Sequence, residues 1–152
     1  MKTTLPIDIV TLGEDNSFHL FVGGSINGQS YDLLIDTGAS HTIFDSSLIP
    51  ELPADKTEGH EIKSAGIHAG ELKTGIGHIK KFKLGDLKYV DWTVVLIDLT
   101  HVNELYGKFS DKRVAGLIGS DFLLKHNAII DYKKPELVLR NIRRKNKTKN
   151  KN

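Results

Sequence analysis

One stretch of the 152-residue sequence places an acidic side chain directly after an apolar strand. Residues 33–35 are Leu-Leu-Ile, and Asp36, Thr37 and Gly38 follow them. A strand that buries three aliphatic side chains ends close to the core, where a carboxylate is costly to ionise. Thr37 offers a hydroxyl that can fix the loop, and Gly38 lets another backbone or a substrate approach the carboxylate. Asp36 is therefore the candidate catalytic residue, suited to general acid–base chemistry.

Other kinds of catalytic or metal site have little support in the sequence. The chain has no cysteine, which excludes disulfides, thiolate zinc sites and a thiol nucleophile. None of its seven histidines has the i, i+4 spacing of a metal-binding helix, so we expect neither a metal site nor a cofactor. His41 follows the Asp36 loop and could line a subsite or tune the carboxylate, or it could be an ordinary surface or hydrogen-bonded histidine.

The elements around Asp36 have the pattern of short strands separated by turns. Alternating Leu5, Ile7 and Ile9 predict one half-buried strand, and Asn27-Gly28 predicts a type I′ hairpin. Residues 101–109 are weakly helical, and a short helix over 121–126 is expected with Ser120 as its cap. This arrangement predicts an all-β fold, a small barrel or sandwich.

Two motifs resemble those of the single-domain, retropepsin-like aspartic proteases of the bacterial type. The first is Ile35-Asp36-Thr37-Gly38, and the second is the buried Leu117-Ile118-Gly119 element followed by a short helix. The resemblance covers roughly residues 17–140. It implies a closed acid-protease-like β-barrel with a long flap hairpin and one short C-terminal helix, and hence a protease domain over residues 1–140.

The resemblance also implies roles for individual residues. Asp36 would be catalytic, and Leu117, Ile118 and Gly119 would pack against the active-site loop. The loop would be supported by three residues: Thr37, Gly38 and Ala39. Two-lobed relatives often carry a hydroxyl at the position of Ala39, and losing a donor to the charged carboxylate predicts a mildly acidic to neutral optimum. The alternative is that the triplet forms only an ordinary Asx-type turn after a strand.

Peptide hydrolysis of this type requires two carboxylates that share a proton, but the chain contains one Asp-Thr-Gly triplet. Asp98, Asp121 and Asp131 lack the sequence context of a second one. A twofold homodimer would supply it as a second copy of Asp36. The predicted function is that of an aspartic endopeptidase acting on a peptide or protein substrate; the alternative is a peptide- or protein-binding module on the same fold.

A glycine-bearing stretch over residues 61–84 predicts the family's flap, a hairpin that covers the substrate. The expected tip and substrate-binding segment is Gly66, Ile67, His68, Ala69 and Gly70. An ordinary exposed hairpin is the alternative, and residues 75–77 are a rival position for its turn.

The charge is distributed unevenly along the chain. Residues 141–152 carry six Lys and Arg and no acid, whereas residues 1–140 carry 15 basic and 19 acidic residues, a net charge of −4. We expect a disordered basic tail over 141–152, with nucleic-acid binding as an alternative that its lack of aromatic residues disfavours. No signal-peptide pattern or membrane-length apolar run is found, so a cytoplasmic protein without membrane contact is expected.

Overall fold

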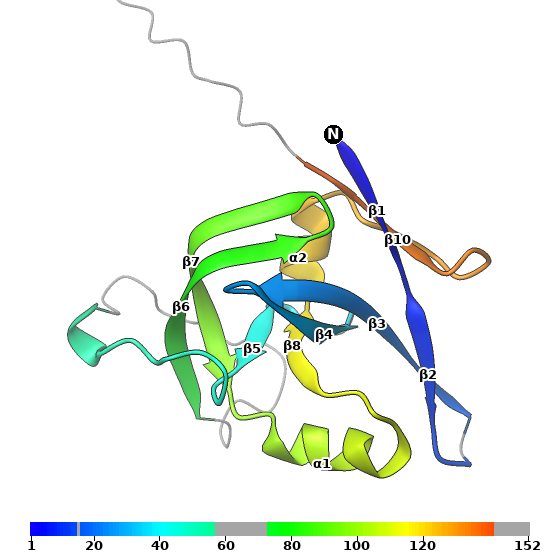
Figure 1. Ribbon diagram of the computed structural model, residues 1–152, viewed down its shortest axis with the longest axis horizontal. Coiled ribbons are helices and arrows are strands. Elements are labelled where there is room, and N and C mark those ends of the chain that lie inside the picture. Colours follow the sequence, from blue (N-terminus) through cyan, green and yellow to red (C-terminus); the bar gives the residue numbers. More distant parts are fainter. Residues whose placement is uncertain (15, 57–72, 142–152) are drawn as a thin grey trace, which may run out of the picture.

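The structure is a computed structural model that describes residues 1–14, 16–56 and 73–141 (Figure 1). Most of the predicted basic tail therefore lies outside the described residues, and its disorder and nucleic-acid binding stay predictions. The elements are β1 (Lys2–Pro6), β2 (Asp8–Leu12), β3 (Ser17–Ile26), β4 (Gln29–Ile35), β5 (Ile43–Asp45), a 3-10 turn η1 (Ala54–Lys56), β6 (Thr74–Leu84), β7 (Leu87–Ile97), α1 (Thr100–Phe109), β8 (Val114–Ile118), α2 (Ser120–Lys125), β9 (Ile129–Asp131) and β10 (Glu136–Arg140).

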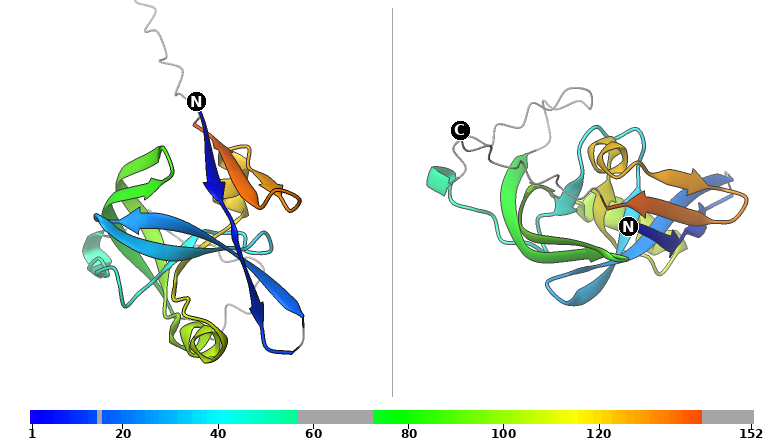
Figure 2. Two further views of the ribbon diagram at one scale, coloured as in Figure 1. Left: turned by 45° about the vertical axis from the view of Figure 1, so that its right-hand side comes forward. Right: turned by 90° about the horizontal axis from the view of Figure 1, so that it is seen from above.

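Six strands form a closed barrel. Their order is β3-β4-β8-β5-β7-β6, and β6 pairs back onto β3 through Ser25–Lys83 and Ile26–Phe82. β2 extends the same sheet beyond β3. The curved β6–β7 hairpin and the β3–β4 hairpin can be followed in both views of Figure 2. The predicted closed all-β barrel is therefore confirmed.

The turns and the core follow from the local sequence. Asn27 and Gly28 both have positive φ, of 50° and 86°, which the predicted type I′ turn requires. The barrel interior is filled by side chains that are almost inaccessible to solvent, including Leu33, Phe44 and Phe82. Burial of this kind is the main favourable contribution to folding and holds the strand ends that carry the site in place.

β8 lies between β4 and β5 and determines where the Asp36 loop sits. β4 runs parallel to β8, with Ile35 beside Ile118, whereas β5 runs antiparallel to β8, with Phe44 beside Gly116. Because β4 and β8 are parallel, their carboxyl ends meet at the same end of the barrel. The loop after Ile35 therefore lies beside the turn after Ile118.

The amino-terminal segment differs from its prediction. The expected single strand is divided in two, since β1 pairs with β10 and β2 pairs with β3. Between them, the Ile7 backbone N–H donates to the Pro135 carbonyl. The alternation of buried residues stops at this change of partner, because Ile7 is buried and Ile9 is 40% exposed. β1, β10 and β9 form a separate three-stranded sheet.

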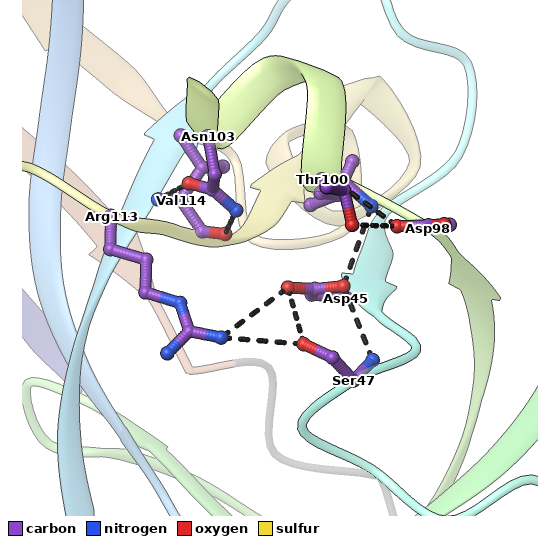
Figure 3. Close-up of polar contacts among 8 residues, drawn as sticks. Asp45, Ser47, Asp98, Thr100, Asn103, Arg113 and Val114 are labelled. Carbon is purple, nitrogen blue, oxygen red and sulfur yellow. Dashed lines mark hydrogen bonds and ion pairs between the residues drawn. The ribbon is translucent and has the colours of Figure 1, made fainter. Parts of the chain in front are cut away.

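The segment between β7 and β8 contains α1, a second helix beside the one that the fold prediction counted. Both ends of this segment attach to one buried carboxylate, that of Asp45 (Figure 3). Its Oδ1 accepts from the Leu99 backbone N–H at 3.4 Å, and its Oδ2 lies 3.9 Å from the Arg113 guanidinium. α1 is therefore held against the barrel at its entry and its exit. No described helix is long and apolar enough to cross a membrane.

Candidate active site

The Asp36 loop is attached to the end of β8 through its backbone. The Asp36 N–H donates to the Ile118 carbonyl at 3.0 Å, and the Ser120 N–H donates to the Ala39 carbonyl at 2.8 Å. Both bonds join the loop after β4 to the turn after β8. The structure therefore brings together the two motifs that the sequence placed about eighty residues apart.

The Asp36 carboxylate is held by its own loop. Oδ1 accepts a hydrogen bond from the Gly38 backbone N–H at 3.0 Å, and the Ala39 N–H donates to the Asp36 carbonyl at 3.2 Å. Asp36 is partly exposed, and Thr37 and Gly38 are exposed beside it. This is the geometry of an Asx turn, which both interpretations of the triplet predict, so the turn alone does not distinguish a catalytic loop from a structural one.

Gly119 makes the close packing of the two motifs possible. A Cβ atom at this position would lie 2.7 Å from the carbonyl carbon and oxygen of His41 and 2.9 Å from the Ala39 carbonyl. These contacts involve backbone atoms, which cannot move aside as the end of a side chain can. A glycine is therefore required where the Leu117-Ile118-Gly119 element meets the loop.

Thr42 and Asp121 form a second connection, which the sequence analysis missed. The Thr42 N–H and hydroxyl donate to Asp121 Oδ1 at 2.9 and 2.7 Å, and the same hydroxyl accepts from the Gly119 N–H at 3.0 Å. The sequence indicates only that Asp121 is not a second catalytic acid, because it opens a helix. Its place in the first turn of α2 was the available signal for a structural role.

α2 begins differently from the prediction. Ser120 is the first residue of α2, Gly119 occupies the N-cap position, and no side chain caps the helix. Asp121 instead accepts from the Phe122 N–H, so a carboxylate inside the first turn takes over part of the capping function.

His41, near the loop, is partly buried, and its Nδ1 is hydrogen-bonded to the Ser40 hydroxyl at 2.9 Å.

A third feature beside Asp36 comes from α1. Tyr106 is the buried residue of this helix, and its hydroxyl lies 2.8 Å from His19 Nδ1. The pKa of Tyr106 is raised by burial and by the negative charge of Asp36, and the direction of its hydrogen bond with His19 depends on the imidazole tautomer. No sequence signal identified this pair, because the two residues are 87 positions apart and lie in unrelated elements.

Tyr106, His19 and Asp36 line one pocket of about 420 Å³. This volume lies within the range of natural small-molecule sites. The other lining residues are mostly apolar: Phe18, Leu20, Leu34, Ile35, Thr37 and Tyr132. A carboxylate at the wall of an open pocket with both polar and apolar surface can act on a bound polar group such as a peptide carbonyl or a water molecule.

A model of the family described as aspartyl protease matches residues 22–122, which is more than half of the chain. The chain belongs to the aspartyl protease family. The matched segment contains both the Asp36 loop and the Gly119 element, and it is narrower than the range of 17–140 that the resemblance covered. The predicted family membership is therefore confirmed, and the site roles of individual residues stay predictions.

Solved structures similar to this aspartyl protease include the following two. The retroviral protease-like domain of Ddi1 from Leishmania major has 22% sequence identity and a TM-score of 0.49, with 82% of this chain and 90% of that chain covered. A retropepsin-like aspartic protease from Rickettsia conorii has 15% identity and a TM-score of 0.43, with 91% and 94% covered. A search of curated proteins found no match.

The predicted flap tip, residues 66–70, lies outside the described residues and stays a prediction. The rival turn at 75–77 is wrong, because Gly75 and Gly77 lie inside β6. A Cβ at Gly77 would lie 2.7 Å from Leu96 Cδ1, so glycine here permits close packing within the hairpin. Glu51 forms an antiparallel bridge with Gly77, which places the chain before residue 57 next to the strand that follows residue 72.

Proposed function

We propose that this aspartyl protease is a homodimeric endopeptidase in which each chain contributes one Asp36. Among the described residues, the other aspartates considered for catalysis already serve local structure. Asp98 accepts hydrogen bonds from Thr100, Asp121 from Thr42, and Asp131 from the Lys133 and Lys134 backbones. Asp36 also accepts a hydrogen bond within its own turn, from the Gly38 N–H, but it is partly exposed at the wall of a pocket. This observation carries the proposal, because one such carboxylate is half of a dyad.

The surface beside Thr37 offers a face for the second copy. Leu124 on α2 is 80% exposed, and Ile129 on β9 is 53% exposed. Leu124 lines a shallow pocket together with Thr37, so this apolar surface is continuous with the catalytic loop. In the part of the chain that the structure describes, β9 pairs on one side only, with β10. A free strand edge beside apolar residues favours association with an identical edge.

The terminal strands support this choice of face. Retroviral proteases interleave their short termini at the dimer interface. Here β1 pairs with β10 of the same chain over five residue pairs, from Lys2–Arg140 to Pro6–Glu136. That pairing occupies the edge of β10 that an interleaved partner strand would need. A dimer built on β9 keeps the intrachain sheet intact and brings the two Thr37 loops toward the twofold axis.

In this proposal, two Asp36 carboxylates about 3 Å apart share one proton, because two like charges this close are costly. The ionised carboxylate accepts a proton from water, whose oxygen attacks the peptide carbonyl carbon. The protonated carboxylate donates its proton to the carbonyl oxygen. The tetrahedral intermediate then collapses: one of its hydroxyl groups returns a proton to the ionised carboxylate as the C=O bond re-forms, the C–N bond breaks, and the leaving nitrogen takes up the proton of the other carboxylate. Gly38 would fix the orientation of each carboxylate through its N–H.

The test combines the mass in solution with cleavage of a mixed peptide library, assayed from about pH 4 to about pH 7. We expect a dimer that cleaves peptides, and loss of all cleavage in Asp36→Asn. Asp86→Asn is the matched control, because Asp86 is an exposed residue of the β6–β7 turn. A monomer that cleaves no peptide at any pH would overturn the proposal. Peptide binding by such a monomer would support the alternative, a binding module.

A further inference from the structure

The segment between β7 and β8 is anchored at several points beside the Asp36 pocket. Asn103 on α1 bonds both backbone groups of Val114, with its Nδ2 donating to the carbonyl at 3.0 Å and its Oδ1 accepting from the N–H at 2.6 Å (Figure 3). Lys112 pairs with Asp8 at 2.7 Å and lies 3.5 Å from Asp32. Anchors on α1 and at the end of the segment fix the position of Tyr106, which lies between them.

Tyr106 and His19 form a polar group inside the pocket. The Tyr106 ring packs edge-on against Phe21 at a centroid distance of 5.4 Å and against His19 at 5.3 Å. Its hydroxyl shares one hydrogen bond with His19 Nδ1, and in either imidazole tautomer the phenol oxygen keeps at least one lone pair able to accept another hydrogen bond. A buried phenol with unused acceptor capacity in a pocket is suited to recognising a donor.

The rest of the pocket favours an aromatic occupant. Phe18 and Tyr132 line it and are 65% and 68% exposed, which is unusual for large aromatic side chains. Leu20 and Leu34 supply further apolar surface. Flat rings stack or pack edge to face on such surfaces, which adds to the energy of burial.

We propose that this pocket selects a tyrosine side chain of the substrate next to the scissile bond, with Tyr106, positioned by His19, accepting the hydrogen bond of the substrate hydroxyl. The inference rests on the proposed function and adds a specificity-determining residue to it. The ring of the substrate would pack between Phe18 and Tyr132 while its hydroxyl reaches Tyr106. An acidic side chain is disfavoured because Asp36 lines the same pocket.

The test uses one cleaved peptide in three forms, with tyrosine, phenylalanine or lysine next to the scissile bond. For the wild type we expect kcat/KM to be about five- to tenfold higher for tyrosine than for phenylalanine, the contribution of one hydrogen bond. In Tyr106→Phe this ratio should fall to near one. Tyr31→Phe is the control that keeps the ratio, because the Tyr31 hydroxyl is bound to Gln29 outside the pocket. An unchanged ratio in Tyr106→Phe, or a preference for lysine, would overturn the inference.

A binding measurement separates this inference from the proposed function. In Asp36→Asn, the dissociation constants of the tyrosine and phenylalanine peptides should differ by a similar factor, and adding Tyr106→Phe should remove the difference. If the wild type cleaves peptides without discrimination, only the specificity is wrong. If it cleaves nothing but Asp36→Asn still binds the tyrosine peptide more tightly, the proposed catalysis is wrong and the recognition stands. Equal binding of both peptides contradicts the recognition.

Discussion

Thr42 and Asp121 lie 79 positions apart in the sequence, and Thr42 donates two hydrogen bonds to the Asp121 carboxylate. The Thr42 hydroxyl also accepts from the Gly119 N–H, so one side chain joins β8, α2 and the loop that carries Asp36. Thr42 is only 6% exposed. Buried groups of this kind are costly to leave unpaired, so this connection should contribute to the stability of the whole site.

Thr42→Val should therefore lower the free energy of unfolding by about 1–3 kcal/mol, because it leaves the Gly119 N–H without its acceptor at nearly constant side-chain volume. Urea denaturation measures the change. Thr74→Val is the matched control, because Thr74 is exposed at the start of β6 and should change stability by less than about 0.5 kcal/mol. Equal effects of the two substitutions would show that the Thr42 network contributes nothing specific.

Gly119→Ala should destabilise the protein by about 1–3 kcal/mol and reduce cleavage, because the new Cβ would meet the His41 and Ala39 backbone. The comparison is Gly107→Ala, at a position inside α1 where a Cβ meets nothing within 4 Å. That substitution should stabilise by about 1 kcal/mol, since alanine has the higher helix propensity. Thermal and urea unfolding of both variants should thus shift in opposite directions; shifts of the same sign would contradict the packing at Gly119.

The burial of His126 leads to a prediction of how the stability of the protein depends on pH. It is buried, its Nε2 is hydrogen-bonded to Tyr89, and its Nδ1 donates to the Arg140 carbonyl. Burial lowers the pKa of His126 in the folded protein, the Arg140 hydrogen bond opposes this, and the Lys125 charge lowers it further. Below the unfolded pKa of about 6.5, the unfolded chain then binds more protons than the folded one, so stability should fall as the pH decreases through this range.

His126→Gln removes this titration, so the loss of stability between about pH 7.5 and about pH 5 should be smaller than in the wild type, even if the variant is less stable throughout. His101→Gln is the control, because the His101 side chain is 98% exposed and should leave the wild-type pH dependence unchanged. Urea unfolding at both pH values measures the difference. A His126→Gln protein with the full wild-type pH dependence would exclude His126 as its source.

The local features of this fold could be predicted from the sequence because each depends on neighbouring residues. Asn27-Gly28 specifies its turn through backbone dihedrals, and the apolar residues 33–35 before Asp36 specify a buried strand that ends in a loop. The division of the amino-terminal strand could not be predicted in this way. It depends on the pairing of Ile7 with Pro135, a residue far away in the chain, and not on any change in the alternating pattern.

The difference between features set by neighbouring residues and features set by distant ones also explains which parts of the site the sequence could identify. The Asp36 loop and the Gly119 element are contiguous motifs, so residue types and their order identify them. Tyr106 meets His19 only because α1 folds back onto the barrel, and a weak helical pattern does not specify which surface a helix will contact. Contacts between distant elements are set by the packing of the whole barrel, which local periodicity does not describe.

The proposed dimer face predicts the effect of one charge on β9. Ile129→Asp places a carboxylate on an exposed strand edge that would face its own copy, so like-charge repulsion should weaken the dimer at least about tenfold. Because each monomer holds one Asp36, cleavage should fall in parallel and recover at higher protein concentration. Sedimentation and peptide cleavage across a concentration series measure both. Val90→Asp is the control, a 61% exposed position on β7, a strand that pairs with β5 and β6 and not with β9. A monomeric Ile129→Asp protein with undiminished cleavage would exclude the shared dyad.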